Sequence, residues 1–271
     1  MPVMDYQSKT QILSRRDDRI CTLTINRPEK HNFLTPGLLQ EMAHTVSELG
    51  RDPDIRALVI RGAGEASFSA GYDVSAIPIK NDQDPEKPIE NISPLEEALQ
   101  AIRNFPFPVI AMVNGHAFGG GCELAVACDI RIGRHGIAMG MPPAKLGIVY
   151  PPVGFRRFLM VLGFAKTLEM FLTGRQYDSH NCLRMGLLNE LAAPDCLKTA
   201  TYDMAIEISQ NAPLALKGTK QALYKIAETT ALSEDEKSEL AALFARSLMT
   251  EDLQEGKRAF MEKRKPCFKG R

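Results

Sequence analysis

The sequence predicts an α/β protein in which strands and helices alternate before an entirely helical C-terminal part. Short apolar runs at residues 57–60 and 109–113 are typical of the buried strands of parallel sheets. Glycine-rich turns follow both runs, and from Gly154 onward long amphipathic patterns replace most strand signals. With 271 residues, 44% of them hydrophobic, the chain can fill a large core.

The first elements have clear boundaries. Residues 20–25 alternate apolar and polar side chains and include β-branched ones, which predicts a strand. Thr35 followed by Pro36 predicts the start of a helix. Its apolar face comprises Leu38, Leu39, Met42, Val46 and Leu49. The run at 57–60, bounded by glycines, is the next strand.

The middle of the chain continues in the same order. Residues 79–94 are polar and rich in proline, which predicts a loop. A helix over 94–103, a strand over 109–113 and a helix over 119–128 follow.

From Gly154 onward, strand signals almost vanish except around residues 187–191. The expected C-terminal helices span 195–209, 214–227, 233–248 and 253–263. We therefore expect a core over residues 1–193 and a helical region over 194–271.

Composition excludes several classes of function. Lys plus Arg number 33 and Asp plus Glu number 33, so no basic field favours nucleic acid. No run of eighteen apolar residues and no apolar leader is present, and we expect a cytoplasmic protein without membrane contact. The six cysteines lack a C-x-x-C pair and should be mostly buried thiols. The histidines lack metal-binding spacing, so no metal site is expected.

Residues 114–125 carry the most unusual sequence, with Gly119, Gly120 and Gly121 between a buried strand and a helix. The first turn of a helix has unsatisfied N–H groups and a positive dipole end, which suit an oxyanion or a phosphate. Alternatively, the glycines only permit close packing of strand and helix. The pattern matches neither a dinucleotide-binding motif nor a P-loop.

Glu123 lies in the first turn of this otherwise apolar helix. Burial would raise its pKa and suit proton transfer, whereas the helix N-terminus would lower it, so the direction stays open. Alternatively, the carboxylate merely complements the helix dipole. A second glycine turn, at residues 67–74, is either a simple turn or the source of another N–H group. Two such donors from separate loops would form an oxyanion hole.

Taken together, four stretches resemble the crotonase superfamily, the enoyl-CoA hydratases and isomerases with their relatives. They span residues 26–32, 68–74, 111–125 and 255–266. The resemblance covers nearly the whole chain. It implies a superhelix of ββα turns with a helical C-terminal trimerisation region, and an acyl-CoA thioester as substrate. Homotrimers or homohexamers are then expected, with no cofactor apart from the coenzyme A of the substrate.

The resemblance also implies roles for individual residues. The N–H groups of Tyr72 and Gly120 would form the oxyanion hole. Glu123 matches the first of the two glutamates with which the family's hydratases hold water. The residues implied to contact coenzyme A are Ala70, Gly71, Tyr72, Asp73 and Val74 near the adenine, and Lys263 near the phosphates.

The position of the second hydratase glutamate falls on Pro143, which offers neither acid nor base. This segment instead resembles the methylmalonyl-CoA decarboxylase branch, where a tyrosine at the position of Tyr150 faces the substrate carboxylate. That branch has a histidine where this chain has Tyr72. Tyr150 could also be a plain core aromatic.

The sequence thus favours an enzyme that stabilises a thioester enolate and decarboxylates a methylmalonyl-CoA-like substrate. An enoyl-CoA hydratase or Δ3-Δ2-enoyl-CoA isomerase that uses Glu123 is the first alternative. A non-catalytic CoA-binding homologue is the second, because a fold does not fix a function.

Overall fold

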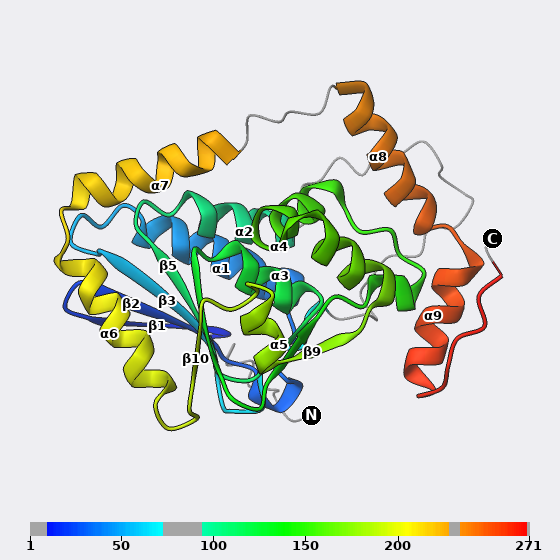
Figure 1. The fold of residues 1–271 in the computed structure, drawn as a ribbon, viewed down its shortest axis with the longest axis horizontal. Helices are drawn as coiled ribbons and strands as arrows, with labels where there is room; N and C mark the ends of the chain where they lie inside the picture. The colour runs from blue at the N-terminus through cyan, green and yellow to red at the C-terminus, as the bar shows by residue number, and fades with distance from the viewer. Residues whose placement is uncertain (1–9, 73–93, 228–233, 270–271) are drawn as a thin grey trace, which may run out of the picture.

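The computed structural model describes residues 10–72, 94–227 and 234–269. Its core is a spiral of ββα turns, in which each turn gives one strand to a six-stranded sheet and the next to a four-stranded sheet (Figure 1). The first full turn consists of β3 (Ala57–Gly62), β4 (Ser67–Ser69) and α2 (Pro94–Asn104). The second consists of β5 (Val109–Val113), β6 (His116–Phe118) and α3 (Gly120–Ala127). The third consists of β7 (Ile130–Arg134), β8 (Ala138–Gly140) and α4 (Pro152–Thr173). This arrangement confirms the predicted fold class.

The six-stranded sheet has the order β1-β2-β3-β5-β7-β10 and is parallel except at its β1 edge. The predicted strand β2 (Ile20–Ile25) pairs with β3 along its whole length. Ile20 lies opposite Ala57, and Ile25 lies opposite Gly62. β10 is Glu190–Ala192. The sequence did not predict β1 (Ile12–Asp17), because five of its six residues are exposed and it carries three charges. Charged, solvent-facing side chains are usual on an edge strand.

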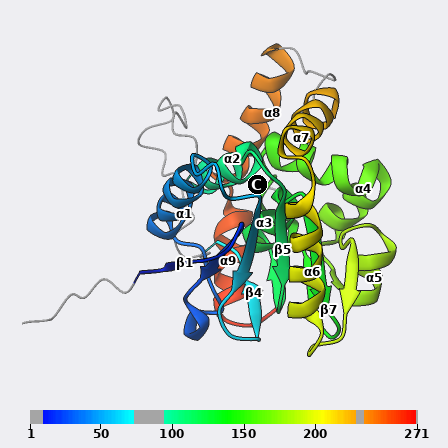
Figure 2. The same ribbon diagram turned by 90° about the vertical axis from the view of Figure 1, so that its left-hand side faces the viewer.

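Helices cover both faces of this sheet. On one face, α6 (Leu197–Gln210) packs on β3, β5, β7 and β10 (Figure 2). On the other face lies the main core, to which α1 (Pro36–Leu49) contributes its apolar side. The predicted start of α1 is confirmed, because the Thr35 side chain accepts a hydrogen bond from the Leu38 N–H at 3.3 Å.

The C-terminal helices run around the core to its far side (Figure 1). They are α7 (Pro213–Ala227), α8 (Glu234–Ser247) and α9 (Glu251–Met261), close to the predicted limits. Because α6 packs on the sheet itself, the division at residue 193 stays a prediction. The loop predicted over residues 79–94 falls almost wholly outside the described residues.

Two helices of the spiral were missed by the sequence interpretation. α4 changes direction at Gly163, whose φ is 69°, so its apolar side chains follow no single helical period. α5 (Ser179–Arg184) is short and follows the three-residue strand β9 (Gln176–Asp178). Within the described ranges, no helix has the length and apolar character needed to cross a membrane.

Candidate active site

Two backbone segments meet where the sequence predicts the oxyanion hole. Tyr72 forms a bridge with Leu34 just after β4, and Gly120 is the first residue of α3. A Cβ atom built on Gly120 would lie 3.4 Å from the Tyr72 nitrogen, and one built on Gly71 would lie 3.2 Å from the Gly120 nitrogen. The two backbone nitrogens are therefore neighbours, although they lie almost fifty residues apart in the sequence.

The glycines around this site have separate tasks. Gly71 has a φ of 98°, and a Cβ there would lie 2.5 Å from the Phe118 carbonyl oxygen. A Cβ on Gly121 would lie 2.2 Å from the Ser69 carbonyl oxygen. A Cβ on Gly120 would have room, because the nearest atom it would meet among the described residues, the Tyr72 nitrogen, lies 3.4 Å away. Close packing, the alternative explanation of Gly119, Gly120 and Gly121, thus accounts for Gly121 but not for Gly119 or Gly120.

Buried polar side chains hold the first of these segments in place. The Asn32 side chain donates to the Ser67 carbonyl at 2.7 Å and to the Ala63 carbonyl at 3.0 Å. The Ser69 hydroxyl donates to the Asn32 carbonyl at 2.8 Å and accepts from the Gly71 N–H at 3.2 Å. These hydrogen bonds fix the backbone that leads to Tyr72. Sequence reasoning gave Asn32 and Ser69 no role of their own.

Glu123 follows Gly120 by one helical turn, so both lie on the same face of α3. Only 3% of Glu123 is exposed, and both of its carboxylate oxygens have partners. The Tyr150 hydroxyl donates to Oε2 in a short hydrogen bond, and Arg157 Nη1 donates to Oε1 at 2.8 Å. Gly154 allows this packing, because a Cβ there would lie 2.4 Å from Tyr150 Cε1 and 2.9 Å from Glu123 Oε1.

Burial sets the protonation behaviour of this pair. It raises the pKa of the Glu123 carboxyl above its usual range, although Arg157 and Tyr150 act in the opposite sense. The direction that the sequence left open is therefore upward. Burial, followed by the nearby negative charge of Glu123, also raises the pKa of the Tyr150 hydroxyl well above its ordinary value. Tyr150 consequently stays protonated and acts as the donor.

Arg157 extends the network to a further helix. Its Nη2 donates to Glu96 Oε1 at 2.5 Å, and Glu96 lies in the first turn of α2. The Arg157 side chain is only 11% exposed. Sequence reasoning missed both Arg157 and Glu96. The one available signal was the pair of adjacent arginines in the otherwise apolar start of α4.

The other residues that the sequence predicts for the site lie in separate segments of the chain. Pro143 is buried in the 3₁₀ turn Pro143–Leu146, which precedes Tyr150. The Ala70 N–H donates to the His31 carbonyl at 3.0 Å and continues the backbone toward Gly71. Lys263 is exposed beyond the end of α9. Asp73 and Val74 lie outside the described residues.

The ring of Tyr150 is also an ordinary part of the core. It packs against Phe155 and Phe171, with ring centroids 6.1 and 5.4 Å away. The interpretation of Tyr150 as a core aromatic is therefore correct for its ring, while its hydroxyl belongs to the Glu123 network.

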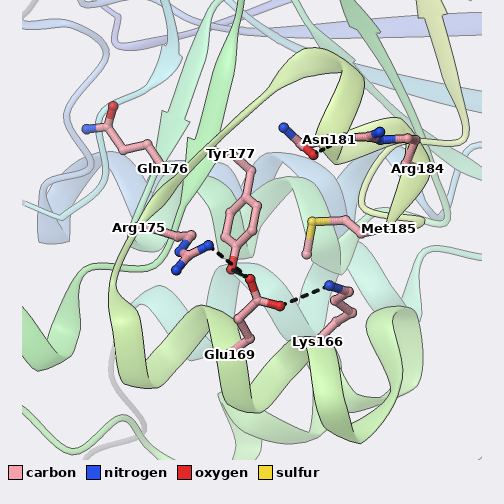
Figure 3. Close-up of a pocket in the computed structure, with 8 residues that line it drawn as sticks. All are labelled: Lys166, Glu169, Arg175, Gln176, Tyr177, Asn181, Arg184 and Met185. Atoms are coloured by element: carbon pink, nitrogen blue, oxygen red, sulfur yellow. Dashed lines mark hydrogen bonds and ion pairs between the residues drawn. The ribbon is translucent and has the colours of Figure 1, made fainter.

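A charged hollow of about 330 Å³ lies elsewhere, between α4, β9 and α5 (Figure 3). In its centre, Glu169 pairs with Lys166 at 2.9 Å and Arg175 at 3.3 Å and accepts from the Tyr177 hydroxyl at 3.3 Å. None of the predicted site residues that the structure describes lines it. Glu169 is the one carboxylate among its lining residues, which also include Lys166, Arg175 and Arg184.

The structure brings the Tyr72 and Gly120 backbone nitrogens together and places a Tyr-Glu pair one helical turn away. Within the described ranges, no group of three or more His, Cys, Asp or Glu side chains is placed to bind a metal ion. Such a site suits chemistry that passes through an enolate.

Comparison with known proteins agrees with this geometry. The family model for enoyl-CoA hydratase/isomerase matches residues 15–271. Methylmalonyl-CoA decarboxylase of Escherichia coli K12 is 31% identical, over 93% of this chain and 95% of the relative. A short-chain-enoyl-CoA hydratase of Clostridium acetobutylicum is 33% identical, over 94% and 95%. The crystal structure of methylmalonyl-CoA decarboxylase complexed with 2S-carboxypropyl CoA aligns at a TM-score of 0.89 and 30% identity, over 99% and 100% of the chains. The chain therefore belongs to the enoyl-CoA hydratase/isomerase family of the crotonase superfamily.

Proposed function

We propose that this acyl-CoA enzyme decarboxylates a short malonyl-type thioester resembling methylmalonyl-CoA. The observation that carries the proposal is the state of Glu123. Both of its oxygens are engaged, by Tyr150 and by Arg157, and the position of a second glutamate is taken by Pro143. A two-carboxylate site for holding water is therefore absent from these positions.

Decarboxylation suits this arrangement because its first step needs little acid-base help. The bond between Cα and the carboxylate carbon breaks, and CO2 leaves. The electron pair of that bond passes to the thioester oxygen and forms an enolate. The N–H groups of Tyr72 and Gly120 would stabilise this oxygen, each contributing about 3–4 kcal/mol. A proton then adds to Cα and restores the thioester carbonyl.

The relatives support this choice. The decarboxylase of Escherichia coli is among the similar proteins, and the crystal structure of methylmalonyl-CoA decarboxylase complexed with 2S-carboxypropyl CoA aligns over nearly the whole chain. By analogy, the substrate would be an acyl-CoA that brings coenzyme A with it, with no separate cofactor. We further propose that Ala70–Val74 and Lys263 contact coenzyme A, and that the chain acts as a cytoplasmic homotrimer or homohexamer.

A Δ3-Δ2-enoyl-CoA isomerase is the second candidate. Glu123 is buried next to the proposed oxyanion site, and its raised pKa favours proton transfer near neutral pH. One carboxylate could take a proton from one carbon of the acyl chain and return it to another. Arg157 and Tyr150 would first have to release one oxygen.

Three substrates distinguish these functions. Purified protein is offered methylmalonyl-CoA, crotonyl-CoA and a 3-enoyl-CoA, while CO2 release and the enoyl absorbance are followed. Release of CO2 from the first supports the decarboxylase, and its failure to react refutes that proposal. Loss of absorbance with crotonyl-CoA would indicate a hydratase. A gain with the 3-enoyl-CoA would indicate an isomerase.

The same assays test the non-catalytic alternative. That alternative requires CoA binding without turnover, and affinity unaffected by Glu123→Ala and Tyr150→Phe. An activity that either substitution abolishes would rule it out.

A further inference from the structure

We propose that Arg157 is a positioning residue, whose guanidinium holds Glu123 as the acceptor of the Tyr150 hydroxyl while Glu96 shares the same guanidinium. The consequence for turnover rests on the proposed function. The positioning itself is a property of the folded chain and can be measured without any substrate.

The geometry that carries this inference is a continuous chain of four side chains. Tyr150 donates to one oxygen of Glu123, and Arg157 Nη1 donates to the other at 2.8 Å. The second nitrogen of the same guanidinium, Nη2, donates to Glu96 Oε1 at 2.5 Å. A planar guanidinium can bridge two carboxylates in this manner, whereas the single ammonium of a lysine cannot match its geometry.

Burial makes the contact consequential. The side chains of Glu123, Arg157 and Glu96 are 3%, 11% and 17% exposed, so water screens their charges poorly. A buried carboxylate without a cation takes up a proton instead of staying charged. A protonated Glu123 would be a donor itself, and the Tyr150 hydroxyl would lose the acceptor that fixes its direction.

The charged and titratable groups that face Glu123 come from each element packed around it. Arg157 projects from α4 and favours the ionised carboxylate, as does the Tyr150 hydroxyl from the segment before α4. Glu96 projects from α2 and disfavours it by repulsion. The thiol of Cys122, the neighbour on α3, is neutral because burial raises its pKa. Arg157 and Glu96 therefore act on Glu123 in opposite directions.

This opposition gives a test that a merely structural role would fail. The protonated carboxyl of Glu123 is followed by infrared spectroscopy as pH is varied, with the spectrum of Glu123→Gln subtracted. We expect Arg157→Gln to shift the titration to higher pH. We expect Glu96→Gln to shift it to lower pH, because the repulsion is lost and Arg157 can bond Glu123 alone. Arg157→Lys should fall between wild type and Arg157→Gln.

Arg156→Gln is the matched control. It removes the same type of charge from the adjacent position of α4, and Arg156 is not among the groups that chiefly set the pKa of Glu123. One of its guanidinium nitrogens is buried and has no hydrogen-bond partner among the residues that the structure describes. Its titration should stay close to that of wild type. Far-UV circular dichroism checks that each variant folds. If Arg157→Gln does not fold, two other variants still test the proposal. They are Glu96→Gln, at a less buried position, and Arg157→Lys, which keeps the charge.

The titration results test the positioning role separately from the proposed function. Opposite shifts for Arg157→Gln and Glu96→Gln support the proposal. Shifts in the same direction, no shift in either, or an equal shift with Arg156→Gln overturn it. If the opposite shifts are found but no thioester is turned over, the proposed function fails while the positioning role stands. If CO2 is released from methylmalonyl-CoA but the titrations do not shift, the positioning role fails while the proposed function stands.

Discussion

Replacing Gly71 with alanine tests the oxyanion hole most directly, because this residue lies between its two proposed donors. The new Cβ would lie 2.5 Å from the Phe118 carbonyl oxygen and 3.2 Å from the Gly120 nitrogen. Real Cβ atoms essentially never approach another heavy atom within 3.0 Å, so the two segments would have to separate by about 0.5 Å or more. The strain falls on the backbone, which has no flexible side chain that could yield.

That separation is large compared with the tolerance of the site. Oxyanion donors act at about 2.7–3.1 Å from the charged oxygen, so a displacement of this size would disengage one of them. We expect kcat to fall about 10²–10³-fold with the substrate that the protein turns over. The φ of 98° adds a cost of about 1–2 kcal/mol to the stability of the variant.

Steady-state turnover and urea unfolding are measured side by side. Gly136→Ala is the control, because its φ of 83° brings comparable backbone strain while its Cβ would meet nothing within 4 Å. The control should lose stability and keep its turnover. If Gly71→Ala keeps near-wild-type turnover, or if both variants lose activity equally, the assignment of the oxyanion hole is wrong.

Individual contacts elsewhere in the structure give three more predictions. Tyr150→Phe removes the donor to the buried Glu123 and should lower stability by about 1–3 kcal/mol in urea unfolding, whereas an unchanged midpoint would contradict the hydrogen bond. Asp129→Ala removes the carboxylate that forms an ion pair with the largely buried Lys220 at 2.7 Å, and it should lower the free energy of unfolding by about 3–5 kcal/mol. A decrease below about 1 kcal/mol would show that this ion pair does not anchor α7. Hydrogen bonds from Arg264 lower the pKa of Glu255 to about 2. The ionised Glu255 carboxylate therefore stabilises the folded protein fully above the ordinary pKa of a glutamate, and this contribution disappears as pH falls toward about 2. Glu255→Gln should therefore be less stable than wild type at neutral pH and match it near pH 2, and a difference that does not change with pH would refute this.

Local signals predicted many elements well. Thr35 and Pro36 marked the start of α1, and the Thr35 cap is present. The apolar runs at 57–60 and 109–113 are β3 and β5, and both are buried from two sides, as continuous apolar runs predict. Such signals work because caps and hydrophobic periods are properties of neighbouring residues.

Other elements were hidden because their stability comes from partners distant in the sequence. β4, β6, β8 and β9 have only three residues each, too few for a period, and exist because they pair across ββα turns. β1 is polar and gains its conformation from pairing with β2. α4 carries a change of direction that no periodic template contains.

The sequence by itself determined the fold class, the parallel strands β2, β3 and β5, most helices and the two glycine segments that meet near Gly120, but it did not predict the central strand β7. It left open the direction of the Glu123 pKa shift and did not identify Arg157 or Glu96 as part of the site. Only the tertiary structure decided these, because it brings a carboxylate, a hydroxyl and a guanidinium together from positions 27 and 34 residues apart and removes them from water. Burial and charge proximity are three-dimensional quantities, and they set the chemistry of this pair.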